Sequence, residues 1–134
     1  MQEQGRVEVE QVLVAPCPAG SMAAVRLRTA SGTSTGVAEG SEASWAVVTA
    51  TARAVEDAVG TCPRLDAVAV DLLGVGGSTV AVVVLTLLSE SGVDRLTGSS
   101  VVDRDTREGA YDALVRATFD AFDRAAAPGD APVG

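Results

Sequence analysis

The feature that most constrains this chain is a pattern that occurs twice. Each half has strand-like stretches, then a glycine-rich turn, then one amphipathic segment with helical spacing. The first turn, residues 36–46, leads into a helix to about Val59, and the second, residues 98–108, leads into a helix to about Ala126. A twofold repeat in only 134 residues favours a pseudo-symmetric regulatory or interaction module over an enzyme with one asymmetric active site.

Three strand-like stretches precede each helix. They alternate apolar with polar residues or are rich in β-branched residues, as strands are. In the first stretch the alternation changes phase at Gln11, which predicts a β-bulge. The order predicts an α+β fold of two pseudo-symmetric βββα units, with antiparallel sheets and two helices packed as two layers. The stretches are residues 7–16, 22–30, 33–38, 65–73, 79–90 and 93–102.

The length fits one domain, which we expect to span residues 7–126, with units at about 7–60 and 65–126. Residues 1–6 and 127–134 are expected to be tails. Within residues 79–90 both faces of the expected strand are apolar, so both must be covered. Two helices cover only one face. The other is expected to meet a second subunit, which predicts a homodimer.

Local signals predict how the helices and turns begin. Ser41 is expected to cap the first helix, and Asp105 with Glu108 is expected to form a capping box at the second. The glycines of residues 74–77 indicate a hairpin turn, because no Gly-Lys-Ser/Thr follows and a strand comes next. Trp45 is expected to pack in the core or an interface, with a place in a ligand pocket as the alternative.

Charge and composition exclude several classes of function. The net charge of −8 disfavours nucleic acid and anionic membrane surfaces as partners. The N-terminus resembles no signal peptide, and the longest apolar run, residues 80–88, is too short to span a bilayer, so a cytoplasmic location is expected. The chain has no histidine, which removes the usual general base and the commonest zinc ligand. No catalytic residue, cofactor or metal is therefore expected.

The remaining reactive residues have ordinary interpretations. Asp103 and Asp105 are spaced so that they could contribute to a hard-cation site, but a helix cap explains Asp105 better. Cys17 and Cys62 are expected to be unpaired thiols, with a disulfide as the alternative. The candidate sites are instead the two strand-to-helix turns. Their glycines let a ligand approach the backbone, and a helix N-terminus attracts a carboxylate.

The order of these segments resembles a known family. The turn and Ala-rich helix at residues 36–54, the strands at 65–70 and 80–85, and the segment 98–114 are similar to the C-terminal regulatory domain of 2-isopropylmalate synthase and citramalate synthases. The resemblance covers residues 7–124. It implies two βββα units, a homodimer, and leucine or isoleucine binding near the turns. The ligand-binding residues that it implies are Gly36, Gly40, Ser41, Ala43, Gly98, Ser99, Ser100 and Asp105.

The chain also departs from that family. Residues 40–44 lack the proline and aspartate of the family's first turn, and there is no catalytic barrel. The resemblance therefore implies a free-standing, non-enzymatic regulatory domain that binds a branched-chain amino acid or a related small carboxylate. The altered turn favours an alternative, a ligand-free module that dimerises or docks onto a separately encoded synthase. A small enzyme is the third hypothesis, disfavoured by the poor acid–base inventory.

Overall fold

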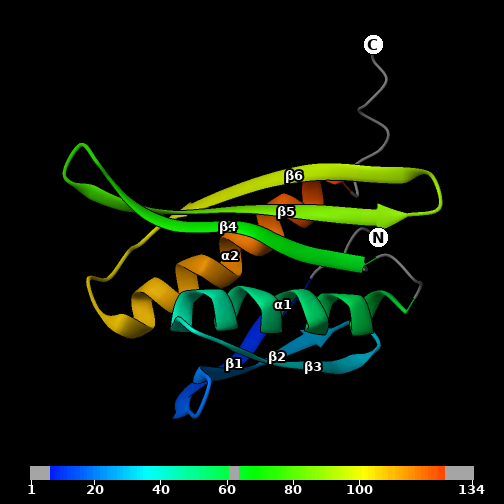
Figure 1. Cartoon of the computed structure of the whole chain (residues 1–134), viewed down its shortest axis with the longest axis horizontal. Helices are drawn as coiled ribbons and strands as arrows, with labels where there is room; N and C mark the ends of the chain where they lie inside the picture. The colour runs from blue at the N-terminus through cyan, green and yellow to red at the C-terminus, as the bar shows by residue number, and fades with distance from the viewer. Residues whose placement is uncertain (1–6, 61–63, 126–134) are drawn as a thin grey trace.

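The computed structural model describes residues 7–60 and 64–125 (Figure 1). Cys62, the N-terminal tail and the C-terminal tail from residue 126 lie outside them. The described chain forms two βββα units, which confirms the predicted α+β fold. The elements are β1 (Glu8–Cys17), β2 (Gly20–Thr29), β3 (Gly32–Gly40), α1 (Ala43–Val59), β4 (Arg64–Val75), β5 (Ser78–Ser89), β6 (Gly92–Val101) and α2 (Arg107–Ala125).

The strands form two separate antiparallel sheets, sheet A (β1-β2-β3) and sheet B (β4-β5-β6). α1 packs on β2 and β3, and α2 packs on β5 and β6, so each unit has the two layers predicted. The helices also contact each other, and both lie between the sheets (Figure 1). The whole molecule therefore has three layers rather than two, because each unit must also cover the outward side of its helix.

The core is the side of each sheet that faces the helices. The central strands bury the same residue types there: Ala23, Val25 and Leu27 on β2, and Ala81, Val83 and Leu85 on β5. All six are fully buried. Each buried Val or Leu stabilises the fold by roughly 1.5–3 kcal/mol. The two units thus have cores of the same kind.

Both sheets carry a β-bulge in the first strand. The β1–β2 register shifts between Val9 and Gln11, which confirms the predicted bulge. The β4–β5 register shifts between Ala67 and Ala69, a second bulge that the residue pattern did not reveal. Val9 pairs with Leu27, and Ala67 pairs with Leu85, so the bulges lie at equivalent places. The units therefore share backbone irregularities as well as element order.

The hairpins are tighter than the sequence suggests. Gly76 and Gly77 both have positive φ angles, 58° and 86°, as a two-residue type I′ turn requires, which confirms a hairpin. The first two strands extend beyond the predicted stretches 7–16 and 22–30, because β1 continues to Cys17 and β2 begins at Gly20. Pro16 is accommodated because β1 is an edge strand, where the ladder tolerates a residue that donates no hydrogen bond.

Both predictions about helix starts were wrong by one residue. The N-cap of α1 is Glu42 rather than Ser41: its carbonyl accepts the Ala46 N–H (3.1 Å), and no side chain caps the helix. The capping box from Asp105 to Glu108 is also absent. Thr106 Oγ1 accepts the Gly109 N–H at 2.9 Å instead. At α2 the neighbouring Thr106 offered a cap of the same kind, whereas the N-cap of α1 lies one residue after the favoured Ser41 and makes no side-chain capping bond.

Candidate functional site

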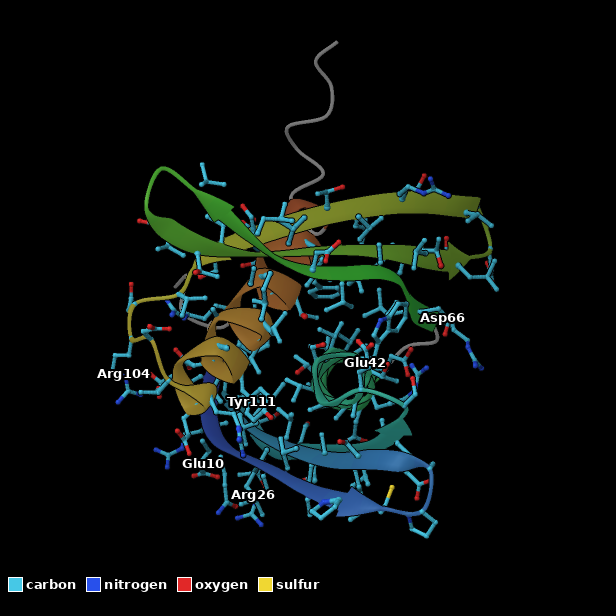
Figure 2. All side chains as sticks on the ribbon, turned by 60° about the vertical axis from the view of Figure 1, so that its left-hand side comes forward. Glu10, Arg26, Glu42, Asp66, Arg104 and Tyr111 are labelled. Carbon is cyan, nitrogen blue, oxygen red and sulfur yellow. The ribbon has the colours of Figure 1, made fainter. Side chains whose placement is uncertain are left out.

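The two helices begin at the same end of the molecule (Figure 1). Residues from the starts of both helices line a groove along β1. We call this the β1 groove. Its volume is about 530 Å³, and it lies between β1 residues 12–16, Ala43 of α1 and the first turns of α2. A second hollow of about 310 Å³ shares Val12, Glu108 and Tyr111 with it. In Figure 2, Tyr111 lies between α2 and sheet A, with Glu10 and Arg104 farther out.

The groove exists because the repeat is imperfect. α1 packs extensively against β4, whereas α2 barely contacts the equivalent strand β1. Two side chains of α1 hold β4: the Leu65 N–H donates to Glu56 Oε2 at 2.6 Å, and Arg53 Nη1 donates to the Leu65 carbonyl at 2.9 Å. We call these bonds the α1–β4 clamp. They bring one strand close to its helix, and β1 has no such tie.

Equivalent helix positions are identified by the two glycines that meet the helices. A Cβ at Gly36 would lie 2.0 Å from the Ala50 carbonyl oxygen, and one at Gly98 would lie 2.0 Å from that of Ala117. By the same spacing, the α2 residues that correspond to Arg53 and Glu56 are as follows: Asp120 and Asp123. These short acidic side chains cannot reproduce the clamp, because the arginine donor is missing.

The start of α1 gives the groove its chemistry. The N-cap residue Glu42 makes no side-chain capping bond to α1, and a helix leaves the N–H groups of its first turn without partners inside the helix. Arg107, exposed at the start of α2, lines the same groove as Ala43. Two helix N-termini and a guanidinium therefore place positive potential at one end. Glu108 adds a single carboxylate beside them.

The opposite wall is aliphatic. Val12 and Val14 of β1 are half-buried and lie on the helix-facing side of the strand, where they pair with Val25 and Ala23. The groove thus combines a positive end, one acid and an apolar wall. This arrangement fits a small zwitterion with an aliphatic side chain better than a fully polar ligand.

The predicted site residues fall into two groups. Ala43 lines the groove, and Gly40 pairs with Ser21, which also lines it; Ser41 is exposed next to Gly40. The others lie elsewhere. Gly36 and Gly98 are buried against helices, where they allow close packing, while Ser99 and Ser100 belong to β6 and Asp105 is exposed before α2.

Sequence reasoning missed the side chains that α2 contributes. Arg107 and Tyr111 were not singled out, and Glu108 was assigned to a capping box. A basic residue in the first helical turn was a usable signal, since helix dipoles disfavour it there. Nothing local, however, indicated that β1 would lie opposite these residues.

The groups considered for metal or redox chemistry have ordinary surroundings. Within residues 7–60 and 64–123, no three His, Cys, Asp or Glu side chains gather as metal ligands would. Asp103 lies 3.4 Å from an Arg116 guanidinium nitrogen. Cys17 is half-buried and free. In the same part of the chain, neither helix has the length and apolar content needed to cross a bilayer.

A second candidate surface is the outer face of sheet B, which points away from the helices. Register places seventeen side chains on it. Its centre is aliphatic, and its four charged residues, Arg64, Asp66, Asp71 and Arg95, sum to zero. The face consists of Arg64, Asp66, Ala69, Asp71, Leu73 and Val75 of β4, Ser78, Val80, Val82, Val84, Thr86 and Leu88 of β5, and Val93, Arg95, Thr97, Ser99 and Val101 of β6.

Several of the large residues on this face are substantially exposed, including Leu73 (44%), Leu88 (48%) and Val93 (64%). Contiguous exposed apolar surface is uncommon on monomers and marks contact sites. Comparison of the chain with models of known protein families found no match, and comparison with curated proteins found none either.

Proposed function

We propose that this protein is a non-catalytic regulatory domain that binds a branched-chain amino acid or a related small carboxylate in the β1 groove and acts as a homodimer. The observation that carries the proposal is the uncapped start of α1, which opens on an aliphatic groove with Arg107 across it. The family resemblance of the sequence points to the same class of ligand.

Each part of an aliphatic amino acid has a counterpart in the groove. The carboxylate is held by the first-turn N–H groups of α1 and by Arg107. The ammonium is held by Glu108, and the side chain packs on Val12 and Val14. The volume of about 530 Å³ lies within the range of small-molecule sites, roughly 300–1,000 Å³.

Calorimetry against leucine, isoleucine, valine and their 2-oxo acids tests this assignment. Arg107→Gln should lower the affinity for every ligand of the panel by about tenfold, because each carries a carboxylate. Glu108→Gln should weaken the amino acids alone, since the 2-oxo acids have no ammonium. Arg26→Gln, on the outer face of sheet A, is the control that removes an arginine outside the groove. Absence of binding at millimolar concentration for the whole panel would contradict the ligand assignment.

The outer face of sheet B supports the homodimer. A second copy is the partner of choice because the chain as a whole carries −8, whereas the charges on this face cancel. In a twofold interface the patch meets itself, so a neutral patch avoids the repulsion that most of this surface would impose. Two sheets packed face to face at about 10 Å would then cover the aliphatic column of β5.

The second candidate function is a ligand-free module that dimerises or docks onto a separately encoded synthase. It is favoured by the aliphatic face of sheet B, which needs a partner but no ligand. Co-purification from the native cell discriminates between the two. A bound enzyme, together with no binding across the amino acid panel, would favour docking. A stable monomer in sedimentation would count against both functions.

A further inference from the structure

A separate cavity lies at the other end of the helices, away from the β1 groove. Its volume is about 320 Å³, and it is enclosed by the C-terminal halves of α1 and α2, by Val7 before β1 and by Leu27 of β2. We call it the C-terminal cavity. The side chains that matter for its chemistry are Val55, Phe119, Phe122 and Asp123.

The cavity occupies the place where the repeat is broken. In the first unit, Arg53 and Glu56 fill the space between helix and strand with the α1–β4 clamp. The equivalent residues of α2 are Asp120 and Asp123, so the arginine and glutamate positions of the clamp both carry aspartate in α2. Asp120 instead accepts the Ser99 N–H at 3.1 Å. Asp123 forms no ion pair with any of the arginines whose side chains the structure describes.

The lining is apolar except for that one acid. Both phenylalanines of the chain line the cavity, although aromatic residues make up only 3% of the sequence. Their equivalents on α1 are the smaller Ala52 and Val55, which are buried in the core. Aromatic ring faces attract cations, and so does the C-terminal end of α1, whose last turn, residues 58–59, also lines the cavity.

The electrostatics of Asp123 agree with this preference. Desolvation by burial, with a smaller contribution from the charge of Asp120, raises the pKa of the Asp123 carboxyl. The ionised carboxylate is therefore less favourable here than in water. A bound cation would reverse part of that cost, whereas a bound carboxylate would add to it.

We propose that the C-terminal cavity is a binding site for a small alkylammonium ion, with the ammonium on Asp123 and the alkyl chain between Phe119, Phe122 and Val55. This site is independent of the β1 groove. Its ligand is a cation without a carboxylate, whereas every ligand proposed for the groove carries one, and the cavity lies at the opposite ends of the helices.

The test uses three probes of equal length, hexylammonium, hexan-1-ol and hexanoate, with the full chain at about pH 7, where free aspartate is ionised. Calorimetry gives the affinities, and amide chemical shifts locate the site. Hexylammonium should bind roughly tenfold more tightly than hexanoate, because only the cation pairs with Asp123 and the rings. The largest shifts should lie at residues 119–123 and around Val55.

Two matched variants separate the charge from the shape. Asp123→Asn should weaken hexylammonium by roughly threefold to tenfold while leaving hexan-1-ol unchanged. Asp57→Asn removes an exposed acid of α1 that does not line the cavity, and should change neither probe. Lowering the pH through the pKa of Asp123 should lower the affinity for hexylammonium and leave the affinity for hexan-1-ol unchanged.

Three results would overturn the proposal. The first is equal affinity for all three probes or no binding of any. The second is an equal loss of hexylammonium binding in Asp123→Asn and Asp57→Asn. The third is a set of shifts centred on the β1 groove. Each can occur whether or not the groove binds amino acids, so the two proposals fail separately.

Discussion

The central strands of the two sheets are alike on one side and different on the other. Facing the helices, β2 and β5 both read Ala, Val, Leu. Facing outward, the equivalent positions differ. On β2 they are Met22, Ala24, Arg26 and Arg28, and on β5 they are Val80, Val82, Val84 and Thr86. The shared side explains why the units have the same fold. The differing side shows that the central strand of sheet B is aliphatic on its outer face where that of sheet A carries two arginines.

The outer face of sheet A is mixed, with charged residues toward one end and the exposed Leu13, Met22 and Val37 toward the other. Arg28 donates to Glu10 Oε2 at 2.7 Å, and this bond is the main reason that the pKa of Arg28 is raised. Glu10 is the extra residue of the bulge in β1, and the residue at the equivalent bulge in β4 is Val68, which is 42% exposed. The extra residue of the bulge is thus charged in the first unit and aliphatic in the second.

The largest expected effect comes from breaking the side that the units share. Leu27→Ala and Leu85→Ala each remove a fully buried side chain, and each should lower the free energy of unfolding by about 2–5 kcal/mol. Chemical denaturation measures both. Values that differ by more than about 2 kcal/mol would show that the two cores are not equivalent.

Exchanging equivalent residues between the outer faces of the two sheets tests whether sheet B alone mediates dimerisation. Val84→Arg places on β5 the residue that β2 carries at the equivalent position, and should weaken dimerisation by about a hundredfold while the monomer stays folded. Arg26→Val is the matched control on sheet A and should leave the dimer unchanged. Sedimentation velocity measures both variants. A Val84→Arg protein that dimerises as the parent does would place the interface elsewhere.

The α1–β4 clamp gives the next contrast. Glu56→Ala removes the acceptor of the Leu65 N–H and should lower the free energy of unfolding by about 1.5–3 kcal/mol, as for other hydrogen bonds to charged groups. Glu56→Gln retains an acceptor oxygen and should recover most of that loss. Asp123→Ala, at the equivalent position of α2, should cost far less, because no such bond exists there. Equal losses in Glu56→Ala and Asp123→Ala, measured by denaturation, would mean that the clamp adds nothing.

What the sequence predicted well depends on contacts between neighbours in the chain. The alternation along residues 22–30 and the change of phase at Gln11 follow from adjacent residues, and both were confirmed. The layer count, the β1 groove and the bonds from Arg53 to β4 depend on how one unit packs against the other. No local pattern records that packing. The predictions of the capping residues failed for different reasons: Asp105 and Thr106 satisfy the same local rule, whereas α1 begins after Glu42 although Ser41 is the favoured capping residue.

The smallest effect tests the asymmetry of the helix ends through pH. Because the pKa of Asp123 is raised in the folded state, the fold favours the protonated carboxyl. Its stabilising contribution is therefore complete below the unfolded pKa, near 3.9, and is lost as the pH rises through the folded pKa. Asp123→Asn should make the protein slightly more stable than the parent at neutral pH, by less than about 1 kcal/mol because the residue is exposed.

The two proteins should converge in stability as the pH falls below that interval, which thermal unfolding across a pH series measures. Asp57→Asn again serves as the control, since it removes the same charge from an exposed position on α1 outside the cavity. If the stability of Asp123→Asn follows the same pH dependence as that of Asp57→Asn, the change in stability is explained by net charge alone. A change in the pH dependence of stability that occurs in Asp123→Asn but not in Asp57→Asn would show that the C-terminal ends of the two helices differ in electrostatics. The outer faces of the two sheets differ in polarity in the same way.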